Sequence, residues 1–281
     1  MKNIRTAPEA QAKNAWAPPG GTLGRLIGQA WQRAVALEMA TVPGSDAAIT
    51  ATAPSLKGAL KGVSVGIIAE LKRSSPSRGL INAGLDARRQ SKAYADGGAA
   101  AVSVLTESGS FGGSIEDLQA VRQSTSLPIL RKDFHVAAAQ LEEAKQLGAS
   151  AALVIVRAIE PSRVSSLAAA ARDTGIEVVF EIRDEAELGI ALDAGAEIIG
   201  VNNRDLETLD VDPSRVERIL PMIPRECVAI AESGYSTRAQ IEAAARAGAD
   251  AVLVGSALSA SDDPMRAVQE LAGVPRTPRS S

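Results

Sequence analysis

The chain has 281 residues, of which 46% are hydrophobic and 22% charged, and its formal net charge is −3. This length suits one large domain or two modest ones, and the composition excludes the intrinsically disordered class. Because charges of both signs are interspersed, we expect neither nucleic acid nor a membrane surface as a partner.

Few residues are available for metal or redox chemistry, since the chain has one cysteine, Cys227, and one histidine, His135. An internal disulfide is impossible and a Cys/His zinc site cannot be assembled. No nucleotide-binding motif is present, so we expect neither a metal nor a cofactor. The N-terminus lacks the apolar core of a signal peptide, and no apolar run reaches about 18 residues. A cytoplasmic location is therefore expected.

The N-terminal part differs in composition from the rest of the chain. Residues 1–21 are expected to be a flexible N-terminus. Residues 22–40, TLGRLIGQAWQRAVALEMA, predict one helix, and residues 41–63 form a connector rich in Pro, Gly, Ser and Ala. An N-terminal helix and connector over 22–63 thus precede the main domain.

Eight short apolar runs follow, each too short for a helix and rich in β-branched residues or leucine. They are VGIIAE (65–70), AAVSVL (100–105), LPILRK (127–132), AALVIV (151–156), EVVFEI (177–182), EIIGVN (197–202), CVAIAE (227–232) and AVLVGS (251–256). Such runs are typical of parallel strands buried on both faces. Helical spacing between them is clearest in Ser114–Arg122, Ala137–Gln146, Glu185–Ala194 and Ser236–Arg246.

Eight strand–helix units in about 200 residues predict a closed (β/α)8 TIM barrel, with a doubly wound open sheet as the alternative. A weak repeat supports closure, because Gly97, Gly148, Gly195 and Gly248 each mark a helix end before every second strand. The barrel is expected to span residues 64–272, followed by a flexible C-terminus at 273–281.

Charged and amide side chains end most of these strands. In such barrels the active site lies at the carboxyl ends of the strands, and side chains alternate between the two faces of a strand. Glu70 and Lys72 therefore share one face, as do Asn202 and Arg204. Lys132, Glu181 and Glu232 end three other strands. The alternative is that these are ordinary solvated loop charges, but charges at so many ends of apolar strands favour a ligand site.

Glycine and serine follow the last two strands and precede helices, as Ser233-Gly234 and Gly255-Ser256. Backbone N–H groups at such positions suit a phosphate dianion, although simple glycine turns are the alternative. Together with the acids and bases, this predicts general acid–base chemistry on a phosphorylated small molecule. An isomerase, an aldolase-like lyase and a ring-closing synthase all remain possible at this point.

The strand ends resemble those of the indole-3-glycerol phosphate synthase family. The matching stretches are IIAELKRSSPSRGLI (67–81), FGGSIEDL (111–118), LPILRKDF (127–134), FEIRDEAEL (180–188), IGVNNRDLETLDVD (199–212), AESGYST (231–237) and ADAVLVGSAL (249–258). The resemblance implies conversion of 1-(2-carboxyphenylamino)-1-deoxy-D-ribulose 5-phosphate to indole-3-glycerol phosphate, with loss of carbon dioxide and water, in tryptophan biosynthesis.

The same resemblance implies roles for the charged residues. Lys132 would be the acid for ring closure, Lys72 the acid for dehydration, and Glu181 the base. Glu70 and Glu232 would orient the lysines. A nearby second ammonium and desolvation would lower the pKa of a catalytic lysine.

The resemblance also assigns substrate contacts. Asn202 would hydrogen-bond a substrate hydroxyl, Arg204 would clamp the carboxylate, and Phe134 would pack on the aromatic ring. The phosphate would be bound by the four loop residues Ser233, Gly234, Gly255 and Ser256, with Ser75 in the first loop over the mouth.

Two further interpretations are weighed. A different phosphosugar barrel, such as phosphoribosylanthranilate isomerase, would lack the combination of Glu70, Lys72 and Lys132-Asp133-Phe134. A catalytically inactive barrel that binds a ligand is favoured only by residues 1–60, which match the family poorly. We expect a monomer or weak homo-oligomer, His135 as a loop residue with no chemical role, and Cys227 as a small buried filler.

Overall fold

The computed structural model describes residues 16–39 and 53–279. The first 15 residues of the predicted flexible N-terminus and residues 41–52 of the predicted connector lie outside these ranges. None of the described helices is long and apolar enough to cross a membrane.

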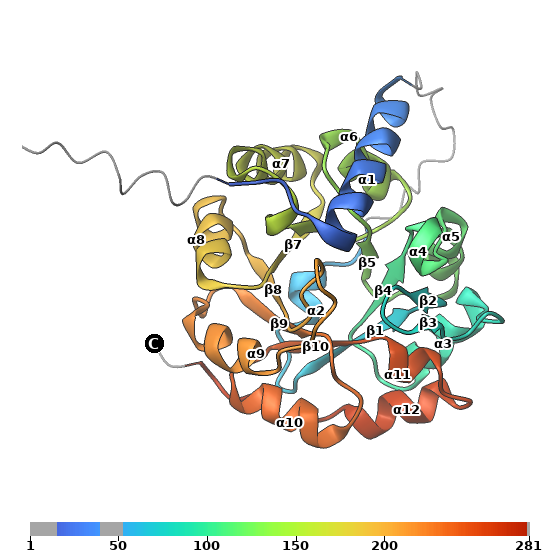
Figure 1. Ribbon diagram of the computed structural model, residues 1–281. Helices are drawn as coiled ribbons and strands as arrows, with labels where there is room; N and C mark the ends of the chain where they lie inside the picture. The colour runs from blue at the N-terminus through green and yellow to red at the C-terminus, as the bar shows by residue number, and fades with distance from the viewer. Residues whose placement is uncertain (1–15, 40–52, 280–281) are drawn as a thin grey trace, which may run out of the picture.

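Eight parallel strands close into a barrel, so the predicted TIM barrel is confirmed and the open sheet is wrong (Figure 1). They are β1 (Gly66–Leu71), β4 (Ala101–Leu105), β5 (Ile129–Lys132), β6 (Ala151–Ile155), β7 (Glu177–Ile182), β8 (Ile198–Asn202), β9 (Val228–Glu232) and β10 (Ala251–Val254). Each strand pairs with its neighbours in chain order, and β10 pairs with β1. Nearly every strand residue is buried, because the barrel interior covers one face of each strand and the helices cover the other.

Helices surround the barrel as the apolar spacing predicts. They are α3 (Ala87–Asp96), α4 (Ser108–Phe111), α5 (Ile115–Ser124), α6 (Ala138–Gln146), α7 (Pro161–Thr174), α8 (Glu185–Asp193), α9 (Ser214–Ile219), α10 (Arg238–Arg246), α11 (Ser256–Ser259) and α12 (Pro264–Leu271), with 3-10 turns at η2 (Val156–Ala158) and η3 (Leu220–Met222). A small hairpin of β2 (Ser74–Ser75) and β3 (Gly79–Leu80) forms the loop after β1.

The repeated glycines allow the tight turns between helix and strand. Gly148, Gly195 and Gly248 have φ between 81° and 97°, in the left-handed region that favours glycine. In the first repeat Gly97 caps α3 with φ −77°, and the left-handed residue is its neighbour Gly98. A Cβ on Gly97 would lie 2.6 Å from the carbonyl oxygen of Met265, so this glycine serves close packing against α12.

The predicted N-terminal helix is α1 (Gly21–Met39), which packs beside α6 and buries Leu23, Ile27 and Ala30 on its inner face (Figure 1). A short helix, α2 (Leu56–Ala59), precedes the barrel. Residues 16–20 differ from the flexible segment expected, since the Arg157 guanidinium donates to the Ala17 carbonyl at 2.7 Å. Arg157 on the barrel therefore holds this segment, and the sequence of residues 1–21 alone cannot show such a partner.

Residues 274–279, within the C-terminus that was expected to be flexible, pack against the barrel. Val274 is buried, and its carbonyl accepts a hydrogen bond of 2.8 Å from the backbone of Val65. The buried guanidinium of Arg279 donates to the Gly248 carbonyl and to Asp250, both at 2.8 Å. Asp250 is buried directly before β10 and requires cationic partners, which Arg276 and Arg279 supply.

Candidate active site

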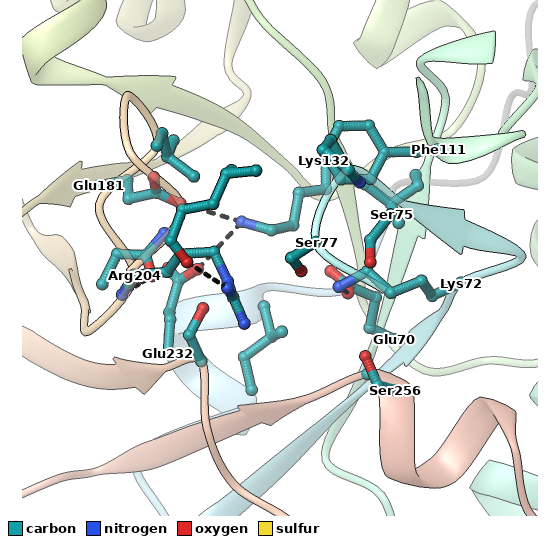
Figure 2. Close-up of a pocket in the computed structure, with 18 of the residues that line it drawn as sticks. Glu70, Lys72, Ser75, Ser77, Phe111, Lys132, Glu181, Arg204, Glu232 and Ser256 are labelled. Carbon is teal, nitrogen blue, oxygen red and sulfur yellow. Dashed lines mark hydrogen bonds and ion pairs between the residues drawn. The ribbon is translucent and has the colours of Figure 1, made fainter. Parts of the chain in front are cut away.

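One cavity of about 170 Å³ opens at the carboxyl ends of the strands, and every candidate residue named from the sequence lines it. Figure 2 shows Lys132 pointing between Glu181 and Glu232 on one side of the cavity, with Glu70, Lys72, Ser75 and Ser256 on the other. The cavity also contains apolar surface from Leu105, Leu153 and Leu253. It therefore combines charged groups with apolar surface, as is typical of a small-molecule site.

The buried charges come from alternate strands of the barrel, with Glu70 on β1, Lys132 on β5, Glu181 on β7 and Glu232 on β9. The intervening strands contribute small residues beside them. Ser103 on β4 donates a hydrogen bond of 3.3 Å to Glu70, and a side chain on Gly255 would collide with the Glu70 carboxylate. Alternation of large and small residues is how these barrels fill their interior, and here the upper layer is charged.

Lys132 is an ammonium held between two carboxylates. Its Nζ donates to Glu181 at 3.0 Å and to Glu232 at 2.9 Å. Burial acts to lower the pKa of Lys132, but the carboxylates of Glu181, Glu232 and Glu70 outweigh it and raise the pKa above the usual lysine value. The expected lowering of the lysine pKa is therefore wrong, because the nearest charges are acids. The two neighbouring acids therefore favour the protonated form of Lys132, which carries a proton to donate.

Glu232 is a completely buried acid whose pKa lies above the usual range. Burial raises the pKa of Glu232 to about 7, with a further contribution from Glu181 and an opposing effect of Lys132. Its Oε1 atom is buried without a hydrogen-bond partner among the described residues. Two adjacent carboxylates share one ammonium here, so proton binding at this acid is possible near neutral pH.

Glu70 and Lys72 form the second pair, and their predicted common face is confirmed by a contact of 2.8 Å between Lys72 Nζ and the carboxylate. The Glu70 side chain is completely buried, whereas Lys72 is 19% exposed. The backbone at this strand end is fixed by Ser259, whose Oγ donates to the Glu70 carbonyl at 2.9 Å and accepts from Lys72 N at 3.0 Å. The second ammonium is thereby held across the cavity from the first.

Arg204 enters the cavity from the loop after β8. Its backbone N–H donates to the side chain of Asn202 at 2.9 Å, and its guanidinium donates to the Leu209 carbonyl at 2.6 Å. Burial lowers the pKa of Arg204, and the nearby charge of Arg78 lowers it further. Two arginines that repel each other across the cavity would bind an anion favourably.

Two lining residues, Phe111 and Arg78, were missed in the sequence. Phe111 lies in α4, and its ring centroid is 6.4 Å from that of Phe134. Both residues occur inside stretches that match the family, FGGSIEDL and KRSSPSRG, and that match was the available signal. The hairpin of β2 and β3 brings Arg78 to the mouth, which the spacing of the strands does not reveal.

The glycine-serine turns after β9 and β10 both face the cavity. Ser233 has φ 66° and Gly234 has φ 93°, so the chain turns sharply there, and Ser256 begins α11 directly after Gly255. A left-handed serine is uncommon and is tolerated mainly at functional sites. Ser75 and Ser77 face these turns from the first loop.

His135 lies in the loop after β5, as the sequence predicts, and its side chain is buried there. It is 2% exposed, and its Nδ1–H donates to the Leu153 carbonyl at 2.8 Å. Burial lowers the pKa of His135 to about 4, with a contribution from Arg131 and an opposing effect of Asp133. Cys227 is buried at the opposite end of the barrel, as expected. Within the described ranges no group of three or more His, Cys, Asp or Glu side chains could hold a metal ion.

Comparison with known proteins decides the family. The family model described as indole-3-glycerol phosphate synthase matches residues 27–271. The chain belongs to the indole-3-glycerol phosphate synthase family. It is 47% identical over 227 residues to the indole-3-glycerol phosphate synthase of Mycobacterium tuberculosis (strain ATCC 25618 / H37Rv), which covers 80% of this chain and 84% of that protein. The synthase of Streptomyces griseus is 48% identical over 224 residues, or 79% of this chain and 83% of that protein.

The chain therefore has indole-3-glycerol phosphate synthase activity, a carboxy-lyase reaction on a phosphorylated small molecule in tryptophan biosynthesis. The alternatives of a different phosphosugar barrel and of an inactive barrel are set aside by this membership. The family match also includes most of α1, although residues 1–60 contain none of the stretches that resemble the family.

Solved structures with low sequence identity share the fold of this synthase. The 3-hexulose-6-phosphate synthase of Salmonella typhimurium has a TM-score of 0.60 at 16% identity, over 74% of this chain and 96% of that one. A thiamine phosphate pyrophosphorylase from Pyrococcus furiosus has a TM-score of 0.57 at 14% identity, over 77% of this chain and 96% of that one. These similarities support the barrel alone.

Proposed function

We propose that Lys132, Glu181 and Lys72 perform the proton transfers of the synthase reaction on 1-(2-carboxyphenylamino)-1-deoxy-D-ribulose 5-phosphate. The observation that carries the proposal is the Lys132 ammonium between Glu181 and Glu232, across the cavity from the pair of Lys72 and Glu70. Two acids on opposite sides suit a reaction in which one oxygen is protonated twice at different stages.

In the first stage, the ring carbon that bears the carboxylate attacks the ribulose carbonyl carbon. Lys132 protonates the carbonyl oxygen as the new carbon–carbon bond forms, and the oxygen becomes a hydroxyl. The bond to the carboxylate then breaks, its electrons restore the aromatic ring, and carbon dioxide leaves. Glu232 and Glu181 accept hydrogen bonds from Lys132 and so orient its remaining protons.

In the second stage, Lys72 protonates the hydroxyl, which leaves as water. Glu181 takes a proton from the carbon beside the nitrogen, and the electrons of that bond form the indole double bond. Glu70 orients Lys72 through their contact of 2.8 Å. Asn202 lines the cavity and is proposed to hydrogen-bond a substrate hydroxyl.

The two ends of the substrate are proposed to bind at opposite sides. Arg204 pairs with the carboxylate, and Phe134 packs on the aromatic ring together with Phe111. The phosphate is bound by the turns after β9 and β10, through Ser233, Gly234, Gly255 and Ser256, with Ser75 as a further donor. We also propose a cytoplasmic enzyme that is a monomer or weak homo-oligomer, and light scattering at two protein concentrations tests the oligomeric state.

Single-turnover kinetics test the division between the lysines. Lys132→Ala and Glu181→Gln should each lower steady-state turnover by at least about a hundredfold, measured by the fluorescence of the indole product. Lys72→Ala should release carbon dioxide at a near-normal rate while the indole signal lags behind it. Lys145→Ala, at a half-buried lysine on α6 that does not line the cavity, is the matched control and should be unchanged. An unchanged rate in Lys132→Ala would refute its role, and equal slowing of both signals in Lys72→Ala would refute the division.

A further inference from the structure

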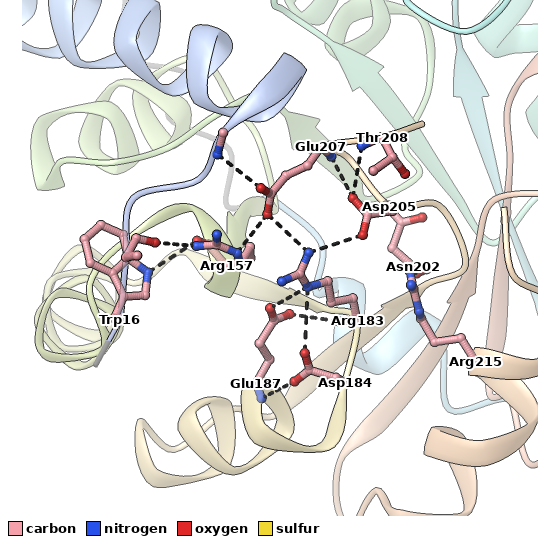
Figure 3. Close-up of polar contacts among 12 residues, drawn as sticks. Trp16, Arg157, Arg183, Asp184, Glu187, Asn202, Asp205, Glu207, Thr208 and Arg215 are labelled. Carbon is pink, nitrogen blue, oxygen red and sulfur yellow. Dashed lines mark hydrogen bonds and ion pairs between the residues drawn. The ribbon is translucent and has the colours of Figure 1, made fainter. Parts of the chain in front are cut away.

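We propose that Arg183 and Glu207 are positioning residues for Arg204, holding the loop between β8 and α9 so that its guanidinium faces the substrate carboxylate. The proposal rests on the function proposed above for Arg204. It arises from a polar cluster beside the active-site cavity, formed by Arg157, Arg183, Asp205 and Glu207, which we call the Glu207 cluster (Figure 3).

Glu207 joins three separate parts of the chain. Its Oε1 accepts from Arg157 Nε at 2.9 Å and lies 3.2 Å from Arg183 Nη1. Its Oε2 accepts from the backbone N–H of Gly20 at 3.1 Å. Arg157 follows β6, Arg183 follows β7, and Gly20 directly precedes α1. One carboxylate therefore attaches the tip of the β8–α9 loop to two strand ends and to the N-terminal segment.

The loop carries this attachment to Arg204 through a tight turn. The Asp205 carboxylate accepts from the backbone N–H of Glu207 at 2.8 Å, and its other oxygen is 3.3 Å from Arg183 Nη1. Leu209 has φ 73°, and its carbonyl accepts from the Arg204 guanidinium at 2.6 Å. The turn that Arg183 contacts is thus the one that fixes the Arg204 side chain.

Arg183 is itself held from the opposite side by α8. Its Nε donates to Glu187 at 3.1 Å, and its backbone N–H donates to the other oxygen of that carboxylate at 2.9 Å. The planar guanidinium of Arg183 can contact Glu187 on one side and Asp205 and Glu207 on the other at the same time. A shorter neutral side chain cannot do this. A small cavity lined by Arg183, Glu181 and Arg204 places this arrangement directly behind the proposed catalytic base.

The backbone at Gly21, where the N-terminal segment enters α1, packs tightly against the β8–α9 loop. Gly21 has φ 57°, and a Cβ there would lie 2.5 Å from the carbonyl oxygen of Glu207. Partly exposed ion pairs contribute little to global stability. Loss of a member of the Glu207 cluster is therefore expected to move the loop and Arg204 while the barrel stays folded.

The test compares Arg183→Gln and Glu207→Gln with Arg204→Ala and with the double variant Arg183→Gln/Arg204→Ala. Arg183→Gln and Glu207→Gln should each raise KM for the carboxyphenylamino substrate about tenfold, with kcat changed less than about twofold. The double variant should have the same KM as Arg204→Ala, because Arg183 acts through Arg204. Backbone amides of residues 205–210 should exchange hydrogen faster in both single variants.

Arg218→Gln is the matched control. Arg218 on α9 forms an exposed ion pair with Glu185 on α8, and this pair lies outside the Glu207 cluster. This variant should change neither KM nor exchange. Unchanged KM in Arg183→Gln and Glu207→Gln, or additive effects in the double variant, would overturn the positioning proposal alone. Unchanged KM in Arg204→Ala would overturn the role proposed for Arg204 and, with it, the positioning. Circular dichroism establishes that each variant is folded. If Arg183→Gln does not fold, the KM of Glu207→Gln alone tests the positioning proposal.

Discussion

Gly200 on β8 leaves the interior space that the Glu232 carboxylate on β9 occupies. A Cβ built on Gly200 would collide with Oε1 of Glu232. Because Glu232 in turn accepts a hydrogen bond from Lys132, the absence of a side chain on one strand determines where the ammonium from another strand can lie. The arrangement of the site therefore depends on residues that carry no functional group.

Gly200→Ala should consequently impair catalysis while adding a single methyl group. The methyl group displaces the Glu232 carboxylate and removes one acceptor of Lys132, so we expect kcat to fall at least about tenfold. Gly189→Ala on α8 is the matched control, because no atom lies within 4 Å of the added Cβ. It should retain activity and stabilise the helix by about 0.5–1 kcal/mol. Full activity of Gly200→Ala would contradict this view of the barrel interior.

The pKa of Glu232, raised by burial to about 7, predicts a pH dependence of kcat/KM. Below pH 7 the carboxylate gains a proton and is lost as an acceptor for Lys132, so activity should decline on the acidic side with an apparent pKa near this value. Profiles of kcat/KM between about pH 5 and 9 should show this limb in the wild type. Glu232→Gln should be slower and should lack it. Persistence of the limb in that variant would assign it to another group.

His135 predicts a loss of folding stability in acid. Its folded pKa of about 4 lies below the ordinary histidine pKa of 6.5, so the unfolded chain binds more protons between these values and stability falls as the pH decreases through that window. The loss should reach about 3 kcal/mol at most by the linkage relation. Urea unfolding at several pH values measures it, and His135→Gln should have a shallower dependence. Equal slopes in the two proteins would show that other groups dominate.

The C-terminal arginine should contribute to stability without affecting catalysis. Arg279→Ala removes one of the two arginine partners of the buried Asp250, the other being Arg276, and leaves the Gly248 carbonyl without this donor. We expect a loss of about 2 kcal/mol in the free energy of unfolding, with KM and kcat unchanged. Arg266→Ala, at a 73% exposed side chain, should change stability by less than about 0.5 kcal/mol. A similar small effect for Arg279→Ala would mean that the segment is held by other contacts.

Most of the fold and the candidate residues were predictable from local patterns. The eight apolar runs predict parallel strands covered on both faces, and their number, with helices between them, favours the barrel. The carboxyl ends of the strands in a closed barrel meet at one mouth. The proximity of Lys72, Lys132 and Glu181 could therefore be predicted from their places at the strand ends. Phe111, Arg78 and the Glu207 cluster were not found, because loops and short helices place them and these have no periodic pattern.

By itself, the sequence determined the barrel, the family and the set of side chains that face the mouth, since these follow from periodicity, strand-end positions and motif identity. Only the tertiary structure decided the direction of the Lys132 pKa, the burial of His135 and the attachment of residues 274–279. Each of these depends on the distance between charges or polar groups far apart in the chain. Coulomb and desolvation energies vary with those distances and with burial, and neither quantity is encoded in local spacing.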